Sequence, residues 1–409
     1  MVGTTLQGLQ QADIDYAPNE EKWRARTERR LKTETLSTDL PPGFPRQLSS
    51  PLVWDGQNVQ KAGNDWTYEL SGGDLEEVER ALRYFQQLNL PVGQVSPETF
   101  PLPSLHAALR EISNKLHNGR GFKVVRGVPV DKYTREENVI VYAGISSHVA
   151  PIRARQVLDR PSQVVLSHVK DLTKTNEKKF IGIGTYTPEL LTFHTDLGDI
   201  VSLLCLETAA EGGASQLASS WHIYNHLAST RPDLIQTLAE DWPHDMSGIG
   251  SRPYVMRPVL HYQPATESAP ERVIIHCVRR TFTGAHEAPR TPGIPPLTEA
   301  QAEALDTLHF LAQRFQLRLD FRRGDIQYIN NLSLLHAREA YLDSPDQQRH
   351  LIRLWLRDPE FAWETPDALK PAHSLAYDNV DPTTQTFPLE PSALTARPAA
   401  HRIPESGRL

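Results

Sequence analysis

Cysteine is almost absent from this chain. The 409 residues include only Cys205 and Cys277, which lie far apart and each inside an apolar stretch. This spacing excludes a disulfide framework and a cysteine-rich zinc module. No apolar run approaches the roughly 20 residues that a membrane helix needs, and the N-terminus has no apolar signal-peptide core. We therefore expect a soluble, cytoplasmic globular protein that does not enter a membrane.

The chain also lacks an excess of positive charge. It has 43 Lys and Arg residues against 50 Asp and Glu residues, a formal net charge of −7. A duplex nucleic-acid binder needs a positive surface that displaces counterions from phosphates, so we expect that the protein binds no nucleic acid. The oligomeric state stays open, and a homo-oligomer is compatible with this composition. The final residues 406–409 resemble a peroxisomal address only loosely, because Gly407 stands where Ser or Ala is usual.

Proline is abundant, with 32 residues against three methionines, which indicates many fixed turns and long loops on a β-rich frame. Apolar spacing predicts several amphipathic helices, and short apolar or alternating runs predict strands. Residues 317–321 and 326–329, which flank Arg322-Arg323-Gly324-Asp325, indicate a strand, a turn and a second strand. Expected helices are 20–32, 74–88, 104–117, 221–227, 232–242 and 298–315, and expected strands are 122–126, 163–169, 200–206, 259–262, 273–278, 317–321, 326–329 and 351–356.

These elements predict one domain with an antiparallel β core and helices packed outside it. We assign this domain to residues 74–358. Residues 1–73 are expected to form a peripheral N-terminal extension. Residues 359–409 are expected to form a Pro-rich tail that wraps the surface.

His194 and Asp196 form the first candidate site. Residues i and i+2 of a strand face the same side, so an imidazole and a carboxylate at this spacing can bind one metal ion. Taken alone, the pair is explained as well by a solvated His and Asp at a strand end. A facial triad of two His and one carboxylate needs a third ligand from elsewhere and leaves one face of the metal open. His336 is the best candidate, because it follows the apolar run 332–335. As a lone residue, it could equally be a core histidine.

Arg349 and Arg353 follow soon after His336. Charged and apolar residues alternate through 349–357, so the two arginines share one strand face. A guanidinium group presents a planar fork that binds a carboxylate through two hydrogen bonds. The alternative is the exposed face of a surface strand.

Together these residues resemble the taurine dioxygenase / 2,4-dichlorophenoxyacetate dioxygenase (TauD/TfdA) family of Fe(II)- and 2-oxoglutarate-dependent oxygenases. The sequence as a whole is similar to those of fungal members of the family found in secondary metabolism. That family has His-x-Asp, then Thr or Ser, then a distal His, then Arg, and here the corresponding residues occur in the same order. The resemblance is clearest from residue 121 to residue 357. The matching residues are His194, Asp196, Ser215 just after Gly212-Gly213, His336, and Arg349 thirteen positions further on.

The serine of this pattern can be matched in more than one way. The gap from Asp196 to Ser215 is shorter than is usual in the family, and Ser219 or Ser220 would suit the spacing better. The preceding Gly-Gly pair favours Ser215. Ser220 can also be explained as the N-cap of the helix at 221–227.

The resemblance implies a mainly β fold with flanking helices, namely a distorted double-stranded β-helix of the jelly-roll, clavaminate synthase-like type. It implies that His194, Asp196 and His336 hold Fe(II), and that Arg349 with Ser215 anchors 2-oxoglutarate. O2 would be the second cosubstrate, and succinate and CO2 would be released. Arg353 would lie near an anionic group of a small substrate such as an amino acid, carboxylate or sulfonate. Its alternative is pairing with an acidic neighbour.

The presence of Asp196 favours hydroxylation, desaturation or ring closure over halogenation, because halogenating relatives lack this carboxylate. Two other functions stay open. A metal-dependent hydrolase could use the same His, Asp and His residues, but it would not need Arg349. A catalytically silent barrel could bind a metabolite, but it would not need three metal ligands.

Overall fold

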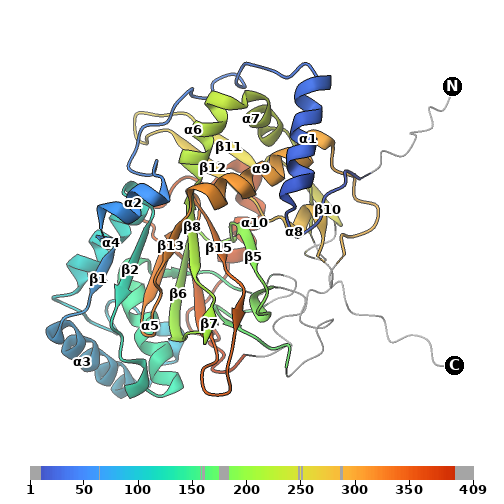
Figure 1. Ribbon diagram of the computed structural model, residues 1–409. Coiled ribbons are helices and arrows are strands. Elements are labelled where there is room, and N and C mark those ends of the chain that lie inside the picture. Colours follow the sequence, from blue (N-terminus) through green and yellow to red (C-terminus); the bar gives the residue numbers. More distant parts are fainter. Residues whose placement is uncertain are drawn as a thin grey trace.

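Two facing β-sheets, with helices on both outer sides, form the centre of the molecule (Figure 1). This computed structural model describes residues 11–391, apart from 64, 157, 159–161, 175–183, 247–248, 250–251 and 286–288. Among the described residues, no helix has both the length and the apolar character needed to cross a membrane. The Ser-Gly-Arg-Leu sequence at 406–409 lies outside the described residues.

The larger sheet has the order β1-β2-β14-β6-β17-β3, and β4 also pairs with β17. All of its pairs are antiparallel except that of β1 with β2, which is parallel. Apolar residues on both faces make this sheet the middle layer of the molecule. Its strands are β1 (Thr67–Glu69), β2 (Phe122–Arg126), β3 (Ile152–Arg153), β4 (Leu166–Lys170), β6 (Ile200–Glu207), β14 (Ile326–Asn330) and β17 (His350–Arg357).

The smaller sheet is antiparallel throughout and has the order β13-β8-β15-β5. Leu217 and Leu334 of this sheet share a buried apolar cluster with Val201 of the larger sheet, so the two sheets pack face to face. This sheet carries three of the predicted site residues, namely His194, Ser215 and His336. Its strands are β5 (Leu191–His194), β8 (Ser215–Ser219), β13 (Leu317–Leu319) and β15 (Leu334–Arg338).

The two strands predicted around Gly324 both form, but they do not pair with each other. β13 joins the smaller sheet and β14 joins the larger one, so the turn at Gly324 connects the two layers. Three short two-stranded sheets lie outside these layers. Their strands are β7 (Glu211–Gly212), β9 (Trp242–Asp245), β10 (Tyr254–Arg257), β11 (Leu260–Gln263), β12 (Arg272–Ile275) and β16 (Tyr341–Leu342).

Helices α3, α4 and α5 cover the outer face of the larger sheet. Leu82, Leu109 and Ile145 from these helices share one buried cluster with Leu204 and Leu354 of the sheet. We did not predict α5, because every residue in it from position 138 to position 149 is buried and its sequence therefore has no polar face. These helices are α3 (Gly72–Leu88), α4 (His106–Asn118) and α5 (Arg135–Val149).

Helices α6, α7 and α9 cover the smaller sheet, where Trp221, Leu234 and Leu308 pack with Ala218 and Leu335. Helical residues outnumber strand residues in the described part, so the expectation of a mainly β chain holds for the central layers and not for the whole. The remaining bounds are α6 (Ser220–Thr230), α7 (Pro232–Ala239), α8 (Arg280–Thr283), α9 (Glu299–Phe315), α10 (Lys370–Tyr377) and the 3-10 turns Val92–Gln94, Val130–Lys132, Gly184–Tyr186 and Asp367–Leu369.

The segments on either side of residues 74–358 also contact the core. Trp54 and Trp66 are buried with the apolar residues between the sheets, next to α2 (Gly56–Ala62) and β1. At the other end, Trp363 packs beneath α6, and the Tyr377 hydroxyl donates to the Leu356 carbonyl.

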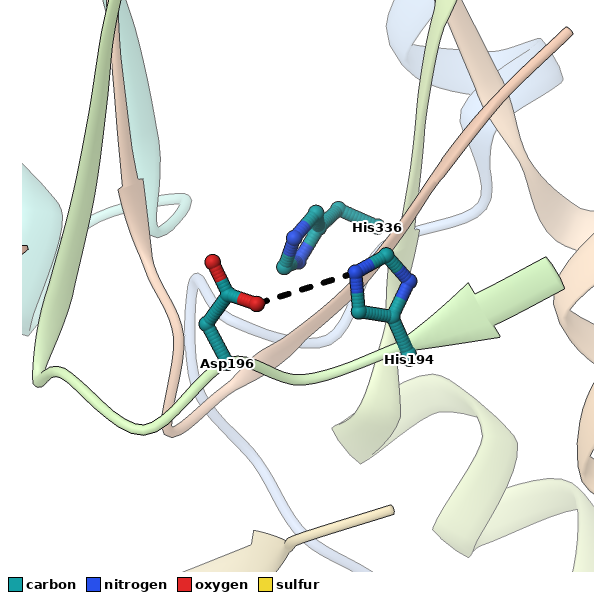
Figure 2. Close-up of side chains that lie close together, drawn as sticks. All are labelled: His194, Asp196 and His336. Atoms are coloured by element: carbon teal, nitrogen blue, oxygen red, sulfur yellow. Dashed lines mark ion pairs between the residues drawn. The ribbon is translucent and has the colours of Figure 1, made fainter. Parts of the chain in front are cut away.

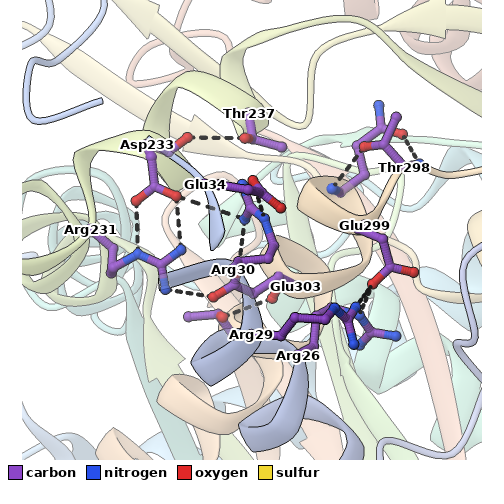
Figure 3. A network of polar contacts seen from close by, with 12 residues as sticks. Arg26, Arg29, Arg30, Glu34, Arg231, Asp233, Thr237, Thr298, Glu299 and Glu303 are labelled. Carbon is purple, nitrogen blue, oxygen red and sulfur yellow. Dashed lines mark hydrogen bonds and ion pairs between the residues drawn. The ribbon is translucent and has the colours of Figure 1, made fainter. Parts of the chain in front are cut away.

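Helix α1 (Glu20–Thr33) is fixed to α9 by ion pairs (Figure 3). Arg26 pairs with Asp306 at 3.0 Å, and Arg30 pairs with Glu303, all four side chains being almost fully buried. Each of these charges also has a further partner, so the buried charges form a network. This attachment fixes the segment that precedes α1, which reaches the candidate site.

Candidate metal centre and its cavity

His194, Asp196 and His336 converge on one point (Figure 2). His194 ends β5, Asp196 follows two residues later, and His336 on β15 is the direct antiparallel partner of His194. One possible ligand atom from each residue lies within 4.8 Å of the others, and His194 Nε2 is 3.8 Å from Asp196 Oδ1. Three ligands, from β15 and from the segment at the end of β5, can therefore surround a single ion.

The orientation of His194 is set by the backbone. Its Nδ1 lies 2.8 Å from the Thr192 carbonyl oxygen. A carbonyl only accepts, so Nδ1 carries the proton and donates it. This leaves Nε2, which lies 3.8 Å from Asp196 Oδ1, as the nitrogen available to a metal ion.

His336 offers a second neutral imidazole. Burial, helped by the neighbouring His194, lowers the pKa of His336 to about 3. Its buried Nδ1 has no hydrogen-bond partner among the described residues. A buried nitrogen without a partner is unfavourable, and a metal ion in the triad suits a neutral imidazole. The donor set of two imidazoles and one carboxylate fits ferrous iron.

Asp196 is held in its ionised form. Burial raises the pKa of its carboxyl, but the nearby Arg353 guanidinium and the hydrogen bond from Trp355 lower it, and the pKa lies well below its usual value. Arg353 Nη1 and Trp355 Nε1 each donate to Asp196 Oδ2 at 2.8 Å. Oδ1 faces His194. The carboxylate therefore presents one oxygen to the metal position.

Arg353 was predicted to lie near an anionic group of the substrate. It lines the cavity, but its guanidinium is bound to Asp196 Oδ2 and to Gln156 Oε1, the latter at 3.0 and 3.2 Å. The alternative named for it, pairing with an acidic neighbour, describes this geometry.

A cavity of about 350 Å³ opens beside the triad. Asp196 is the one acidic residue among the described residues that line it. Both sheets contribute apolar lining, which limits the access of water to the metal position. The basic side chains that line the cavity are Arg279, Arg280, Arg338, Arg349 and Arg353.

Arg349 lies just before β17 with its side chain buried in this cavity. Its Nη1 has no partner among the described residues. Gly213 packs against it, because a Cβ placed on Gly213 would lie 3.1 Å from Arg349 Nε. Gly213 also has a φ of +73°, which favours glycine. The second glycine of the Gly-Gly pair noted in the sequence therefore leaves room for the Arg349 side chain.

The three candidate serines have different partners. Ser215 lines the cavity, and its Oγ donates to Gln327 Oε1 at 3.0 Å. The Ser219 hydroxyl caps α6 by accepting from the His222 amide at 3.0 Å. The Ser220 hydroxyl donates to the Ser333 carbonyl. The N-cap is thus Ser219 and not Ser220, because α6 begins one residue earlier than predicted.

The sequence analysis missed several lining residues. Gln327 and Trp355 come from predicted strands. Arg338 lies on β15, which was not among the expected strands, but it could have been found because it lies two positions after His336. Tyr16 lies in the segment before α1 and has no detectable sequence signal. This segment is held by Arg279, whose Nε and Nη2 both donate to the Asp15 carbonyl.

Comparison with known proteins agrees with this geometry. A sequence model of the family described as "Taurine catabolism dioxygenase TauD, TfdA family" matches residues 84–355. The taurine hydroxylase-like protein SAT17 of Stachybotrys chartarum is 40% identical over 331 residues, covering 79% of this chain and 83% of that protein. The FR-33289 synthase of Streptomyces rubellomurinus is 28% identical, covering 76% and 90%.

Solved structures with the same fold are more distant in sequence. An asparagine oxygenase, solved with Fe(II), 3-hydroxyasparagine and succinate, has a TM-score of 0.52 at 17% identity, covering 71% of this chain and 93% of that one. The non-haem iron oxygenase OrfP, solved with iron, succinate and 3-hydroxyarginine, has a TM-score of 0.51 at 15% identity, covering 74% and 98%. At such identities the likeness shows the shared fold.

Proposed function

Because the chain belongs to the TauD/TfdA family of non-haem iron, 2-oxoglutarate-dependent dioxygenases, we propose which of its residues bind the metal and which bind the cosubstrate. His194, Asp196 and His336 hold ferrous iron. The proposal rests on one observation above all: three possible ligands from two remote segments meet within 4.8 Å of one another.

Arg349 and Ser215 bind the distal carboxylate of 2-oxoglutarate. Arg349 supplies a charged nitrogen without a partner in the described part of the chain, and the Ser215 hydroxyl is held nearby by Gln327. Gln327 Nε2 also has no partner among the described residues and is a further donor at this end of the cavity. Charge-assisted hydrogen bonds from a guanidinium group suit this task.

Iron and 2-oxoglutarate together supply O2-dependent oxidation of a C–H bond, with succinate and CO2 as the products of the cosubstrate. The protein orients the side chains that would hold the metal. Arg353 and Trp355 bind Asp196 Oδ2, so Oδ1 is the oxygen presented to the iron position. With Asp196 occupying a ligand position, hydroxylation, desaturation or ring closure is favoured over halogenation.

The two facing antiparallel sheets support the finer proposal of a distorted double-stranded β-helix as the catalytic core. We assign this core to residues 74–358, with 1–73 and 359–409 as additions to it. The substrate is a small anion, such as an amino acid, a carboxylate or a sulfonate. The five arginines of the cavity support this class, and the solved proteins of the same fold bind hydroxylated amino acids.

The test is an anaerobic titration of the protein with Fe(II) and then 2-oxoglutarate, followed by measurement of succinate release across a panel of amino acids, sulfonates and carboxylates. We expect one iron per chain and cosubstrate binding that depends on iron. Substrate-dependent succinate release then identifies the substrate. Metal-dependent hydrolysis without O2 would contradict the proposal, as would the absence of 2-oxoglutarate binding to the iron-loaded protein.

A further inference from the structure

Arg338 is a buried arginine to which the proposed function gives no task. It lies on β15 two positions after His336, so both side chains leave the strand on the same face. It lines the cavity, and only 4% of it is exposed. A guanidinium group in this position must be solvated by something other than bulk water.

The described residues provide hydrogen-bond acceptors for only some of the N–H groups of Arg338. Arg338 Nη2 donates to the carbonyl oxygens of Thr187 and Glu189, the first at 2.8 Å. Nε and Nη1 have no partner among the described residues. These two nitrogens carry three N–H bonds. Leaving charged donors buried without acceptors is costly, so the geometry calls for a group with several acceptor oxygens.

Two other arginines of the cavity already have acidic partners. Arg353 is paired with Asp196 at 2.8 Å, and Arg279 is paired with Asp306 at 2.7 Å. Arg349 is assigned to the cosubstrate. Since Asp196 is the one acid of the described lining, that lining does not neutralise the charge of Arg338.

The guanidinium groups of Arg338 and Arg349 both lie against the ring of Tyr341. The Arg338 guanidinium carbon is 4.9 Å from the centroid of the Tyr341 ring, and that of Arg349 is 5.3 Å from the same centroid. Two guanidinium groups this close repel each other unless each has an anion of its own. One carboxylate of 2-oxoglutarate satisfies Arg349, and the other carboxylate belongs at the metal.

We propose that Arg338 binds the anionic group of the primary substrate, and that the cavity prefers a net anion, such as a carboxylate or sulfonate, to a zwitterion. An ammonium group would find no free carboxylate in the described lining, because Asp196 is a metal ligand already paired with Arg353. The inference rests on the proposed function and narrows its substrate class. It also moves the anion-binding role from Arg353 to Arg338.

The test is calorimetric titration of the full-length protein, kept anaerobic with Fe(II) and saturating 2-oxoglutarate. The probes are sulfate, butanoate, the zwitterion 4-aminobutanoate and the neutral butanamide. We expect wild type to bind sulfate and butanoate, and to bind the other two more weakly. Arg338→Gln should weaken sulfate and butanoate by about tenfold or more, since it removes charge-assisted hydrogen bonds, and should leave the affinity for 2-oxoglutarate unchanged.

Two further variants separate binding from folding. Arg338→Lys keeps the charge and should keep most of the sulfate affinity. Arg318→Gln removes an exposed arginine of the same sheet that pairs with Glu339 at 2.8 Å, and it should bind all probes as wild type does. The proposal is overturned if Arg338→Gln binds sulfate as tightly as wild type, if it loses 2-oxoglutarate affinity instead, or if 4-aminobutanoate binds as well as butanoate. Failure of the proposed function itself is distinguishable, because wild type would then not bind 2-oxoglutarate.

Discussion

Asn331 holds the backbone of Asp196 by two hydrogen bonds that run in opposite directions. The Asp196 amide donates to Asn331 Oδ1 at 2.8 Å, and Asn331 Nδ2 donates to the Asp196 carbonyl at 2.8 Å. Nδ2 also donates to the Gly198 carbonyl at 2.7 Å. The Asn331 side chain, which lies five residues before His336 in sequence, thus fixes the turn that presents the carboxylate ligand.

Asn331→Ala is expected to weaken iron binding by roughly ten- to a hundredfold, the range seen when groups that orient metal ligands are removed. Titration of the purified protein with Fe(II) measures this. The matched control is Asn330→Ala, because Asn330 bonds the Leu116 carbonyl and the Leu332 amide and does not touch the Asp196 turn. It should lower thermal stability and leave iron affinity unchanged. Equal iron affinities in the two variants would contradict the prediction.

His336→Ala is expected to abolish iron-dependent turnover, because two remaining ligands do not form a facial site. Iron content after anaerobic loading and succinate release are the two measurements. His226→Ala is the control, since His226 lies on α6 with its ring against Phe315 and outside the cavity lining. Stoichiometric iron binding by His336→Ala would contradict the assignment.

Arg349→Ala is expected to raise the 2-oxoglutarate requirement by roughly ten- to a hundredfold, as expected for the loss of hydrogen bonds to a charged group. Iron binding should be unaffected, because Arg349 touches no metal ligand among the described residues. Cosubstrate titration of the iron-loaded variant measures the effect. An unchanged affinity for 2-oxoglutarate would mean that another residue anchors its distal carboxylate.

Gly213→Ala is expected to displace Arg349 and to weaken 2-oxoglutarate binding several-fold. The new Cβ would lie 3.1 Å from Arg349 Nε and 3.2 Å from its Cδ. Gly293→Ala is a matched control, because Gly293 has a similar φ of +83° and a Cβ added there would meet no described atom within 4 Å. Both variants should lose stability from the same backbone strain, while only Gly213→Ala should lose cosubstrate affinity.

Stability is expected to fall between pH 6.5 and pH 4. Burial and the nearby Arg257 lower the pKa of His261 to about 4 and that of His244 to about 3. Each folded-state pKa lies below the unfolded value of about 6.5, so the unfolded chain takes up protons first as the pH falls. The contribution of the neutral His261 is complete above pH 6.5 and is lost towards pH 4.

This loss amounts to at most about 3 kcal/mol for His261. His276 lies in the same group, and burial lowers its pKa in the same direction. Urea unfolding at several pH values, in wild type and in His261→Gln, measures the slope. The variant should lose less stability over this range, and identical slopes would contradict the prediction.

The local sequence was sufficient to predict helices and strands whose apolar residues recur with one clear period. The strand at 122–126 forms with the predicted bounds, and the helix predicted at 74–88 begins two residues earlier, at Gly72, where Ser71 caps it. The pattern failed for α5, which is buried on all sides. It also could not tell that β13 and β14 join different sheets, since strand pairing is a long-range property.

The sequence by itself determined the family and the identity of the candidate metal ligands, because a motif requires only residue types in order and this chain keeps them from His194 to Arg349. Tertiary structure alone decided which arginines of the cavity have an acidic partner. Arg353 and Arg338 look alike in sequence, yet one guanidinium meets Asp196 while the other faces the cavity with two nitrogens unpaired among the described residues. Such differences depend on which remote groups share a small buried volume, where an unmatched charge is expensive.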